Sequence, residues 1–311
     1  MIHTEPLRSA QIDNLKGLAI ILVVFGHAIQ NSTPIFDQNI IFNYIYSFHM
    51  PLFMFLSGYV LYGKNISLKN KFKSLVIPFI SWYMLTYAIN LLRGFQVDGF
   101  PQHMIKLLKY PDNGLWFLLA LFLNISYLKL VQFFVDIRTK KYVDAFSLLA
   151  AYILIQYVPT NYLGIGFVKW HFFFFSLGFL TPKYGKEILQ NIYFKTSAIV
   201  GFIFLGYYWR RIGIPIDWNY VSSFLNNQHL SFFELYLSRI YYMLVPTLGI
   251  YASLAIVPDR INNYILSILN YLGHKSLEIY VVYTNFIYAF VTKTIQVFLT
   301  AFMSVLLSLA T

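Results

Sequence analysis

Long apolar runs, separated by short polar segments, make up most of the chain. A helix needs about 20 mainly apolar residues to cross the hydrocarbon core of a bilayer. We expect a spanning helix in each of ten runs, over residues 15–30, 44–62, 75–92, 115–134, 143–158, 168–181, 193–210, 238–257, 277–292 and 294–310. The pattern predicts an all-α polytopic membrane protein with about ten transmembrane helices.

The first apolar run follows Arg8 and Lys16, and a basic segment before an apolar run also opens many signal peptides. A small-residue cleavage site does not follow the run, because the chain continues with His-Ala-Ile-Gln-Asn over residues 27–31. We therefore expect a retained transmembrane helix.

Basic residues are distributed unevenly between the predicted loops. If the N-terminus is cytoplasmic, fifteen of the 23 Lys and Arg residues lie on the inner side. Inner loops of membrane proteins carry such an excess, so we expect both termini in the cytoplasm.

The composition agrees with a membrane protein. Charged residues make up 11% of the 311 residues, against about a quarter in an ordinary soluble domain. The net charge of +11 comes from short loops and indicates topology, so we expect no nucleic-acid partner. The absence of cysteine excludes disulfides, thiolate metal sites and a cysteine nucleophile. We expect one integral-membrane domain over residues 1–311, with multiple passes through a bacterial plasma membrane.

Lys16 and His27 lie eleven residues apart in the first predicted helix, which is close to three turns and about 16 Å. Both side chains would share one stripe, with a cation near one helix end and an imidazole well inside. A protonatable side chain within a spanning helix is costly, so His27 is a candidate functional residue. The alternative is a histidine that hydrogen-bonds a neighbouring helix.

His49 lies in the second predicted helix, at a depth comparable to that of His27 because the chain has turned back. Pro51 removes a backbone donor two residues later and can kink the helix around a cavity. We consider His49 a second catalytic candidate. The alternative is an interfacial histidine beside a kink.

His171 lies between Trp170 and Phe172 at the start of a predicted helix, which is more typical of an aromatic belt than of a catalytic site. Three histidines at similar depth could also bind a metal ion. None of them forms a local pair with ligand spacing, so we expect no metal.

Four side chains on the predicted cytoplasmic face could gather around an anionic ligand: Asp13, Lys16, Lys71 and Lys73. The alternative is that these basic residues only set the topology. The sequence has no phosphate-cradling glycine loop and no serine nucleophile elbow, so nucleotide hydrolysis and serine-hydrolase chemistry are not supported.

Two predicted outer segments, residues 93–114 and 211–237, are long enough to suggest a function. We expect them to contact an acceptor substrate. The side chains that we assign to acceptor binding are Trp116, Trp218, Glu234 and Arg239.

Two motifs together resemble the membrane acyltransferases of acyltransferase family 3, especially the sugar O-acetylase branch. Residues 8–27 read RSAQIDNLKGLAIILVVFGH, and residues 48–59 read FHMPLFMFLSGY. Three weaker similarities follow: KFKSLVIP over residues 71–78, LWFL over 115–118, and LGHKSLEIY over 272–280. The resemblance covers essentially the whole chain and is strong up to about residue 118.

The resemblance implies acyl transfer from acetyl-coenzyme A to a hydroxyl of a cell-surface polysaccharide or its lipid-linked precursor. It implies that His27 is catalytic and that the basic residue eleven positions before it is essential. This chain departs from the family pattern twice. The basic residue is commonly Arg but is Lys16 here, and the histidine that often ends the closing motif corresponds to Tyr283.

Coenzyme A carries phosphates at one end of a long arm and the thioester at the other. A surface cation and an imidazole three turns further in would suit those two ends. His27 could act as a general base or could carry the acyl group transiently. Two other functions remain open: a transporter or flippase of glycan precursors, with histidines in a proton relay, and an acyltransferase that acts on an amino acid or small metabolite.

Overall fold

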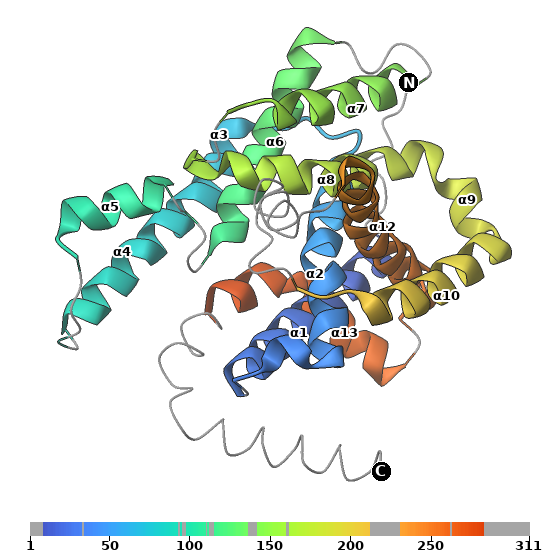
Figure 1. Cartoon of the computed structure of the whole chain (residues 1–311), viewed down its shortest axis with the longest axis horizontal. Coiled ribbons are helices and arrows are strands. Elements are labelled where there is room, and N and C mark those ends of the chain that lie inside the picture. The colour runs from blue at the N-terminus through green and yellow to red at the C-terminus, as the bar shows by residue number, and fades with distance from the viewer. Residues whose placement is uncertain are drawn as a thin grey trace. The chain divides into compact units, whose positions relative to one another are not determined.

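We analysed a computed structural model of the whole chain (Figure 1). It describes residues 9–282, apart from residues 33, 93, 95–97, 110, 112–114, 136–141, 160, 161, 212–230 and 262.

Helices account for all the regular secondary structure of these described residues, which include no β-strand. The α-helices are α1 (Ala10–Ser32), α2 (Ile40–Tyr59), α3 (Leu68–Lys71), α4 (Ile77–Leu92), α5 (Phe100–Lys109), α6 (Trp116–Phe134), α7 (Val143–Gln156), α8 (Ile165–Tyr184), α9 (Lys186–Gln190), α10 (Ile192–Tyr208), α12 (Phe232–Ile256) and α13 (Tyr264–His274). Short 3-10 turns cover Phe36–Gln38 and Tyr162–Gly164, and a π-helical turn over Phe72–Val76 joins α3 to α4.

Among the described residues, six helical segments are long and apolar enough to cross a membrane: Ala10–Ser32, Ile40–Tyr59, Leu68–Leu92, Trp116–Phe134, Tyr162–Tyr184 and Leu237–Ile256. Two shorter apolar helices, Val143–Gln156 and Ile192–Tyr208, fall on two further predicted spans. The regular structure of the described residues is therefore all helical, as predicted, and it is consistent with a multi-pass membrane protein. The total of ten spans and the orientation of the termini stay predictions, because the last two spans lie mostly or wholly outside the described residues.

The chain forms two compact units. The first comprises residues 1–56, 187–211 and 238–311, and the second comprises residues 57–186 and 212–237. Both α2 and α12 pass from one unit into the other.

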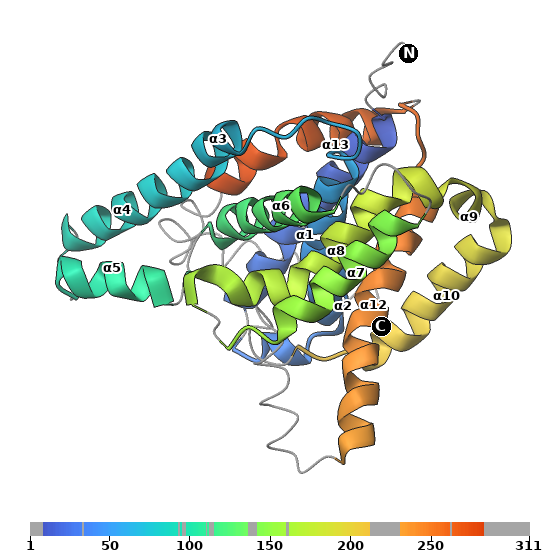
Figure 2. The same ribbon diagram turned by 90° about the horizontal axis from the view of Figure 1, so that it is seen from above.

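In the first unit, α1 and α13 lie side by side (Figures 1 and 2). Two glycines allow their backbones to touch. A Cβ added to Gly17 would lie 1.9 Å from the carbonyl oxygen of Leu269, and one added to Gly273 would lie 1.8 Å from that of Asp13. No side chain can be accommodated at such distances, so these glycines fix how the two helices cross.

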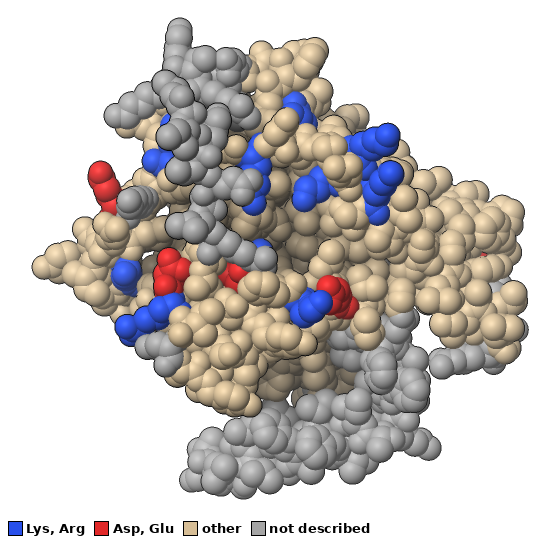
Figure 3. Space-filling model, turned by 180° about the vertical axis from the view of Figure 1, so that it is seen from behind, with Lys and Arg blue, Asp and Glu red and all other residues tan. Residues whose placement is uncertain are grey.

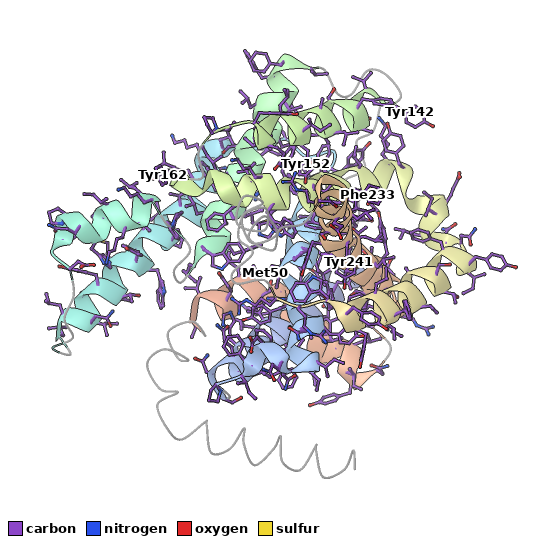
Figure 4. The ribbon with its side chains drawn as sticks, in the orientation of Figure 1. Met50, Tyr142, Tyr152, Tyr162, Phe233 and Tyr241 are labelled. Atoms are coloured by element: carbon purple, nitrogen blue, oxygen red, sulfur yellow. The ribbon has the colours of Figure 1, made fainter. Side chains whose placement is uncertain are left out.

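Glycines also make room for aromatic rings between α2, α10 and α12. A Cβ on Gly206 would lie 2.6 Å from the ring of Tyr44, and one on Gly249 would lie 2.7 Å from the side chain of Phe48. Tyr241, labelled on α12 in Figure 4, donates a hydrogen bond to the carbonyl of Leu205 at 2.8 Å. This packing holds α10 and α12 against α2.

In the second unit, α4 and α5 run side by side (Figures 1 and 2), and α8 packs against both α6 and α7. A buried carboxylate joins the ends of α7 and α8. Asp144 accepts hydrogen bonds from the ammonium of Lys183 at 2.8 Å and from the hydroxyl of Tyr184 at 2.6 Å. Tyr142, labelled in Figure 4, caps this group by stacking on Tyr184.

Charged side chains form small separate groups on a mostly uncharged surface (Figure 3). Large apolar side chains stay exposed instead, among them Phe133 and Phe134 at the end of α6. Such exposure suits a surface that faces lipid.

Candidate functional site

Helix α1 carries the predicted pair of residues on one uninterrupted helix. Lys16 lies in its second turn and His27 lies five residues before its end at Ser32. The helical rise therefore separates them by about 16 Å along the axis, as the sequence spacing predicts.

Tyr46 of α2 connects the two candidate catalytic histidines. Its ring lies 6.1 Å from the imidazole of His27 and 4.8 Å from that of His49, measured between ring centroids, with an edge-to-face arrangement in both cases. Its hydroxyl donates a 2.7 Å hydrogen bond to the side-chain carbonyl of Gln30 on α1. The two imidazoles thus contact one ring, which agrees with their expected similar depth.

His49 is buried, with 2% of its surface exposed. Its Nδ1 lies 2.7 Å from the carbonyl oxygen of Ile45, and only a protonated Nδ1 can donate to that acceptor. In the neutral ring this leaves the lone pair on Nε2, which is the form that a general base requires.

A cation that the sequence analysis did not assign to the site lies at the same ring. The guanidinium carbon of Arg211, just after α10, lies 4.7 Å from the centroid of Tyr46, 5.7 Å from Phe42 and 5.9 Å from Phe36. Tyr46 therefore contacts Arg211 as well as both histidines. We refer to Tyr46, His27, His49 and Arg211 as the histidine cluster.

The sequence holds one signal for Arg211, because Arg210 ends the predicted span 193–210 and Arg211 directly follows it. Sequence reasoning treated both arginines as topology signals. A pair of arginines at the end of an apolar run does not reveal which distant aromatic ring one of them contacts.

The other end of α1 carries a second polar group. Asp13 is buried, and its Oδ1 lies 3.6 Å from Nζ of Lys16. Its Oδ2 lies 3.7 Å from Nε2 of His274, the last residue of α13. We refer to Asp13, Lys16 and His274 as the carboxylate cluster, and of the four predicted donor ligands it contains Asp13 and Lys16.

The first turn of α1 is held by the loop that joins α12 to α13. Asp259 accepts hydrogen bonds from the hydroxyl of Ser9 at 2.9 Å and from the backbone N–H of Gln11 at 2.8 Å. The side-chain amide of Asn14 donates to the carbonyls of Pro258 and Arg260. Helix N-termini have unsatisfied N–H groups, so a carboxylate from a distant loop is a stabilising cap.

Lys71 and Lys73, the other predicted donor ligands, belong to the second unit. Lys71 ends α3 and is partly buried, and Lys73 is exposed on the π-helical turn. Single π-helical turns are frequent at functional sites.

Trp116, a predicted acceptor contact, stacks on two side chains of α8. Its ring lies 5.1 Å from Phe167 and 5.5 Å from His171, with interplanar angles near 25°. We expected His171 in an aromatic belt, yet only 2% of its surface is exposed, inside the second unit. The spacing within α8 alone could not show that Trp116 would cover it.

Of the other predicted acceptor contacts, Trp218 lies outside the described residues. Glu234 starts α12 and accepts hydrogen bonds from the hydroxyl and the backbone N–H of Ser231. The hydroxyl and backbone hydrogen bonds from Ser231 lower the pKa of Glu234. Arg239 is partly buried one turn further along α12. Among the described residues, no three His, Asp or Glu side chains are grouped so that they could hold a metal ion.

Comparison with known proteins identifies the family. A family model described as an acyltransferase domain, from acyltransferase family 3, matches residues 9–311. The chain belongs to acyltransferase family 3. The match begins at Ser9 and includes α1, the histidine cluster and the carboxylate cluster.

Two curated relatives of this acyltransferase family 3 member are nodulation proteins. Nodulation protein NolL of Sinorhizobium fredii is 30% identical over 190 residues, which cover 58% of this chain and 50% of the relative. Nodulation protein NolL of Mesorhizobium japonicum is 25% identical over 183 residues, which cover 56% and 48%. The matched part of the chain therefore spans about half the length of these relatives. No solved structure matches the chain.

Proposed function

We propose that this protein transfers an acetyl group from acetyl-coenzyme A to a hydroxyl of a cell-surface polysaccharide or of its lipid-linked precursor. The proposal rests on the positions of two residues of α1, in a chain that belongs to an acyltransferase family. One end of the helix holds Lys16 beside a buried carboxylate, and the other end holds His27 in the histidine cluster.

In the proposed reaction, the acceptor hydroxyl attacks the thioester carbonyl carbon while a histidine removes the hydroxyl proton. The new C–O bond forms, the C–S bond breaks, and the thiolate of coenzyme A takes up the proton. We assign the base to His27. His49 contacts the same Tyr46 ring, and because Ile45 holds its Nδ1–H, we propose that its Nε2 accepts the proton in a relay.

The reaction passes through a tetrahedral intermediate with a negative oxygen, which needs a stabilising charge or donor. Arg211 supplies a cation at the histidine cluster. Its guanidinium lies over three aromatic rings, and cation–π contacts hold it in place. We propose that this cation stabilises the negative oxygen.

The direct test uses the full-length protein in lipid nanodiscs, radiolabelled acetyl-coenzyme A, and surface glycan extracted from a strain that lacks the protein. The proposal predicts label in the glycan and a mass increase equal to one acetyl group. If the glycan stays unlabelled but crosses the bilayer of proteoliposomes, the protein is a transporter and the proposal is wrong.

The role of Arg211 can be tested by comparing substitutions of Arg211 with a substitution of Arg210. Arg211→Gln should reduce the transfer rate about a hundredfold, since loss of one oxyanion-stabilising donor typically has that effect, and Arg211→Lys should retain part of the rate. Arg210→Gln removes the same charge one residue earlier, from a side chain that bonds the carbonyls of Tyr207 and Trp209. Equal effects of both Gln variants would contradict a specific role of Arg211.

A further inference from the structure

His274 is not among the residues that the sequence assigns to donor binding, yet it shares a carboxylate with Lys16. The side chain of Asp13 has 3% of its surface exposed, whereas those of Lys16 and His274 have 24% and 40%. A buried carboxylate thus holds two nitrogen groups that both reach solvent.

Both ring nitrogens of His274 face oxygen acceptors. Nδ1 lies 2.8 Å from the backbone carbonyl oxygen of Asn270, and Nε2 lies 3.7 Å from Oδ2 of Asp13. Nε2 is too far from the carboxylate of Asp13 for a hydrogen bond. A proton on Nε2 would nevertheless place the positive charge of the ring beside this buried carboxylate.

Among the described residues, the charges around this group balance except for that of His274. Lys16 offsets Asp13, and in the loop before α13 Asp259 and Arg260 are of opposite sign. Beyond α13, Lys275 pairs with Glu278 at 2.9 Å, and its hydrogen bond to Glu278 raises its pKa. The protonation of His274 thus decides whether these described groups are neutral or carry a net positive charge.

The position of His274 is fixed by the helix crossing described above. Gly273, directly before it, has a backbone in contact with that of Asp13. Asn270, one turn earlier, donates a hydrogen bond to the side chain of Asn14. The two helix ends therefore present Lys16 and His274 as one unit.

We propose that Lys16 and protonated His274 together bind the phosphate groups of the coenzyme A donor, and that deprotonation of His274 weakens this binding. The inference rests on the proposed donor, because phosphate is the anionic part of coenzyme A. An imidazole changes its charge between about pH 5 and 8. Donor affinity thus becomes sensitive to pH at the surface where α1 begins.

The test measures binding of coenzyme A, and of S-acetylpantetheine as a ligand without the nucleotide phosphates, by calorimetry on the full-length protein in nanodiscs. His274→Gln should weaken coenzyme A binding at pH 6 about fivefold, the effect of one partly exposed ion pair. It should leave S-acetylpantetheine binding unchanged. Lys275→Gln, which removes the neighbouring cation paired with Glu278, should change neither.

The pH dependence is read against His274→Lys, which keeps a cation throughout this range. A phosphate monoester loses its second proton near pH 6, but that change in the ligand is common to both proteins. The ratio of coenzyme A affinities, wild type over His274→Lys, should therefore fall between pH 6 and 8 if His274 is the sensor.

The possible results distinguish a failure of this inference from a failure of the proposed function. If the wild type binds coenzyme A and His274→Gln binds it equally well, the inference is wrong and the donor assignment stands. If His274→Gln loses both ligands equally, His274 only supports the fold, and the inference is again wrong. If the wild type binds no coenzyme A at pH 6, the proposed donor fails and the inference fails with it.

Discussion

Gly26 and Tyr46 are packed so closely that a Cβ on Gly26 would lie 2.8 Å from Cε2 of the tyrosine ring. Gly26 directly precedes His27, and Tyr46 contacts both histidines. The absence of a side chain at Gly26 therefore allows the aromatic ring to reach the proposed base.

Gly26→Ala should reduce acyl transfer because the added methyl group displaces the Tyr46 ring from His27. Overpacking of this kind costs about 1–3 kcal/mol, so we expect the loss of activity to accompany a modest loss of stability. Gly201→Ala is the control, since its Cβ would meet only the flexible end of Leu248 at 3.3 Å. Equal activity of the two variants would contradict a role for this contact.

The orientation of α2 can be tested with single cysteines in this cysteine-free chain. Gln38 and Asn65 are exposed and flank α2. The charge distribution predicts that Gln38→Cys reacts with an impermeant maleimide from outside the cell and that Asn65→Cys reacts only after lysis. Reaction of both in intact cells would overturn the topology.

The loop cap on α1 should stabilise the carboxylate cluster. Asp259→Ala removes the acceptor of Ser9 and Gln11, and loss of a helix cap costs about 1 kcal/mol. We expect a lower melting temperature and faster amide exchange over residues 9–16. Asp37→Ala removes the same charge from the 3-10 turn after α1 and should leave that exchange unchanged.

Some of this arrangement could be predicted from the sequence, and some could not. The apolar run 15–30 predicted α1, but α1 begins at Ala10 because the polar side chains of Gln11 and Asn14 bond the α12–α13 loop. Hydropathy counts such residues against a spanning helix. The spacing of Lys16 and His27 followed from helical geometry alone.

Contacts between distant segments were beyond sequence reasoning. Helix α13 lies in a stretch that we treated as a loop, and nothing in the sequence pairs its Gly273 with Gly17 of α1. A single glycine in an apolar helix has many causes, so the pair could not be matched without the fold. Arg211 was missed for the same reason, since its partner Tyr46 lies far away in sequence.

The contact between α4 and α5 should depend on pH. His103 of α5 stacks on Tyr83 and Tyr87 of α4, at 4.3 and 4.5 Å, and its Nε2 is buried without a hydrogen-bond partner. Burial lowers the pKa of His103, an effect that the nearby charge of Lys106 adds to and that of Asp98 opposes.

Because the pKa of His103 is lowered in the folded state, the stability of this contact depends on pH. The unfolded state binds a proton more readily than the folded one, so the stabilisation is complete above the ordinary pKa near 6.5 and is lost as the pH falls through the lowered value. Amide exchange of α5 should therefore be faster at pH 5 than at pH 7.5, after correction for intrinsic rates. His103→Phe, which keeps the stacking, should remove this difference in exchange. If the difference persists in His103→Phe, another group causes it.

The two ends of α1 should have separable roles, and one matched experiment tests this prediction. Acetyl-coenzyme A affinity and the rate of acetyl transfer are measured on the same nanodisc preparations of the wild type, His27→Ala and Lys16→Ala, with Lys16→Arg as the conservative control. The account predicts that His27→Ala keeps donor affinity and loses about a hundred- to ten-thousand-fold in rate. Lys16→Ala should weaken donor binding, and Lys16→Arg should preserve it. Near-normal transfer by His27→Ala, or unchanged donor affinity in Lys16→Ala, would contradict the account.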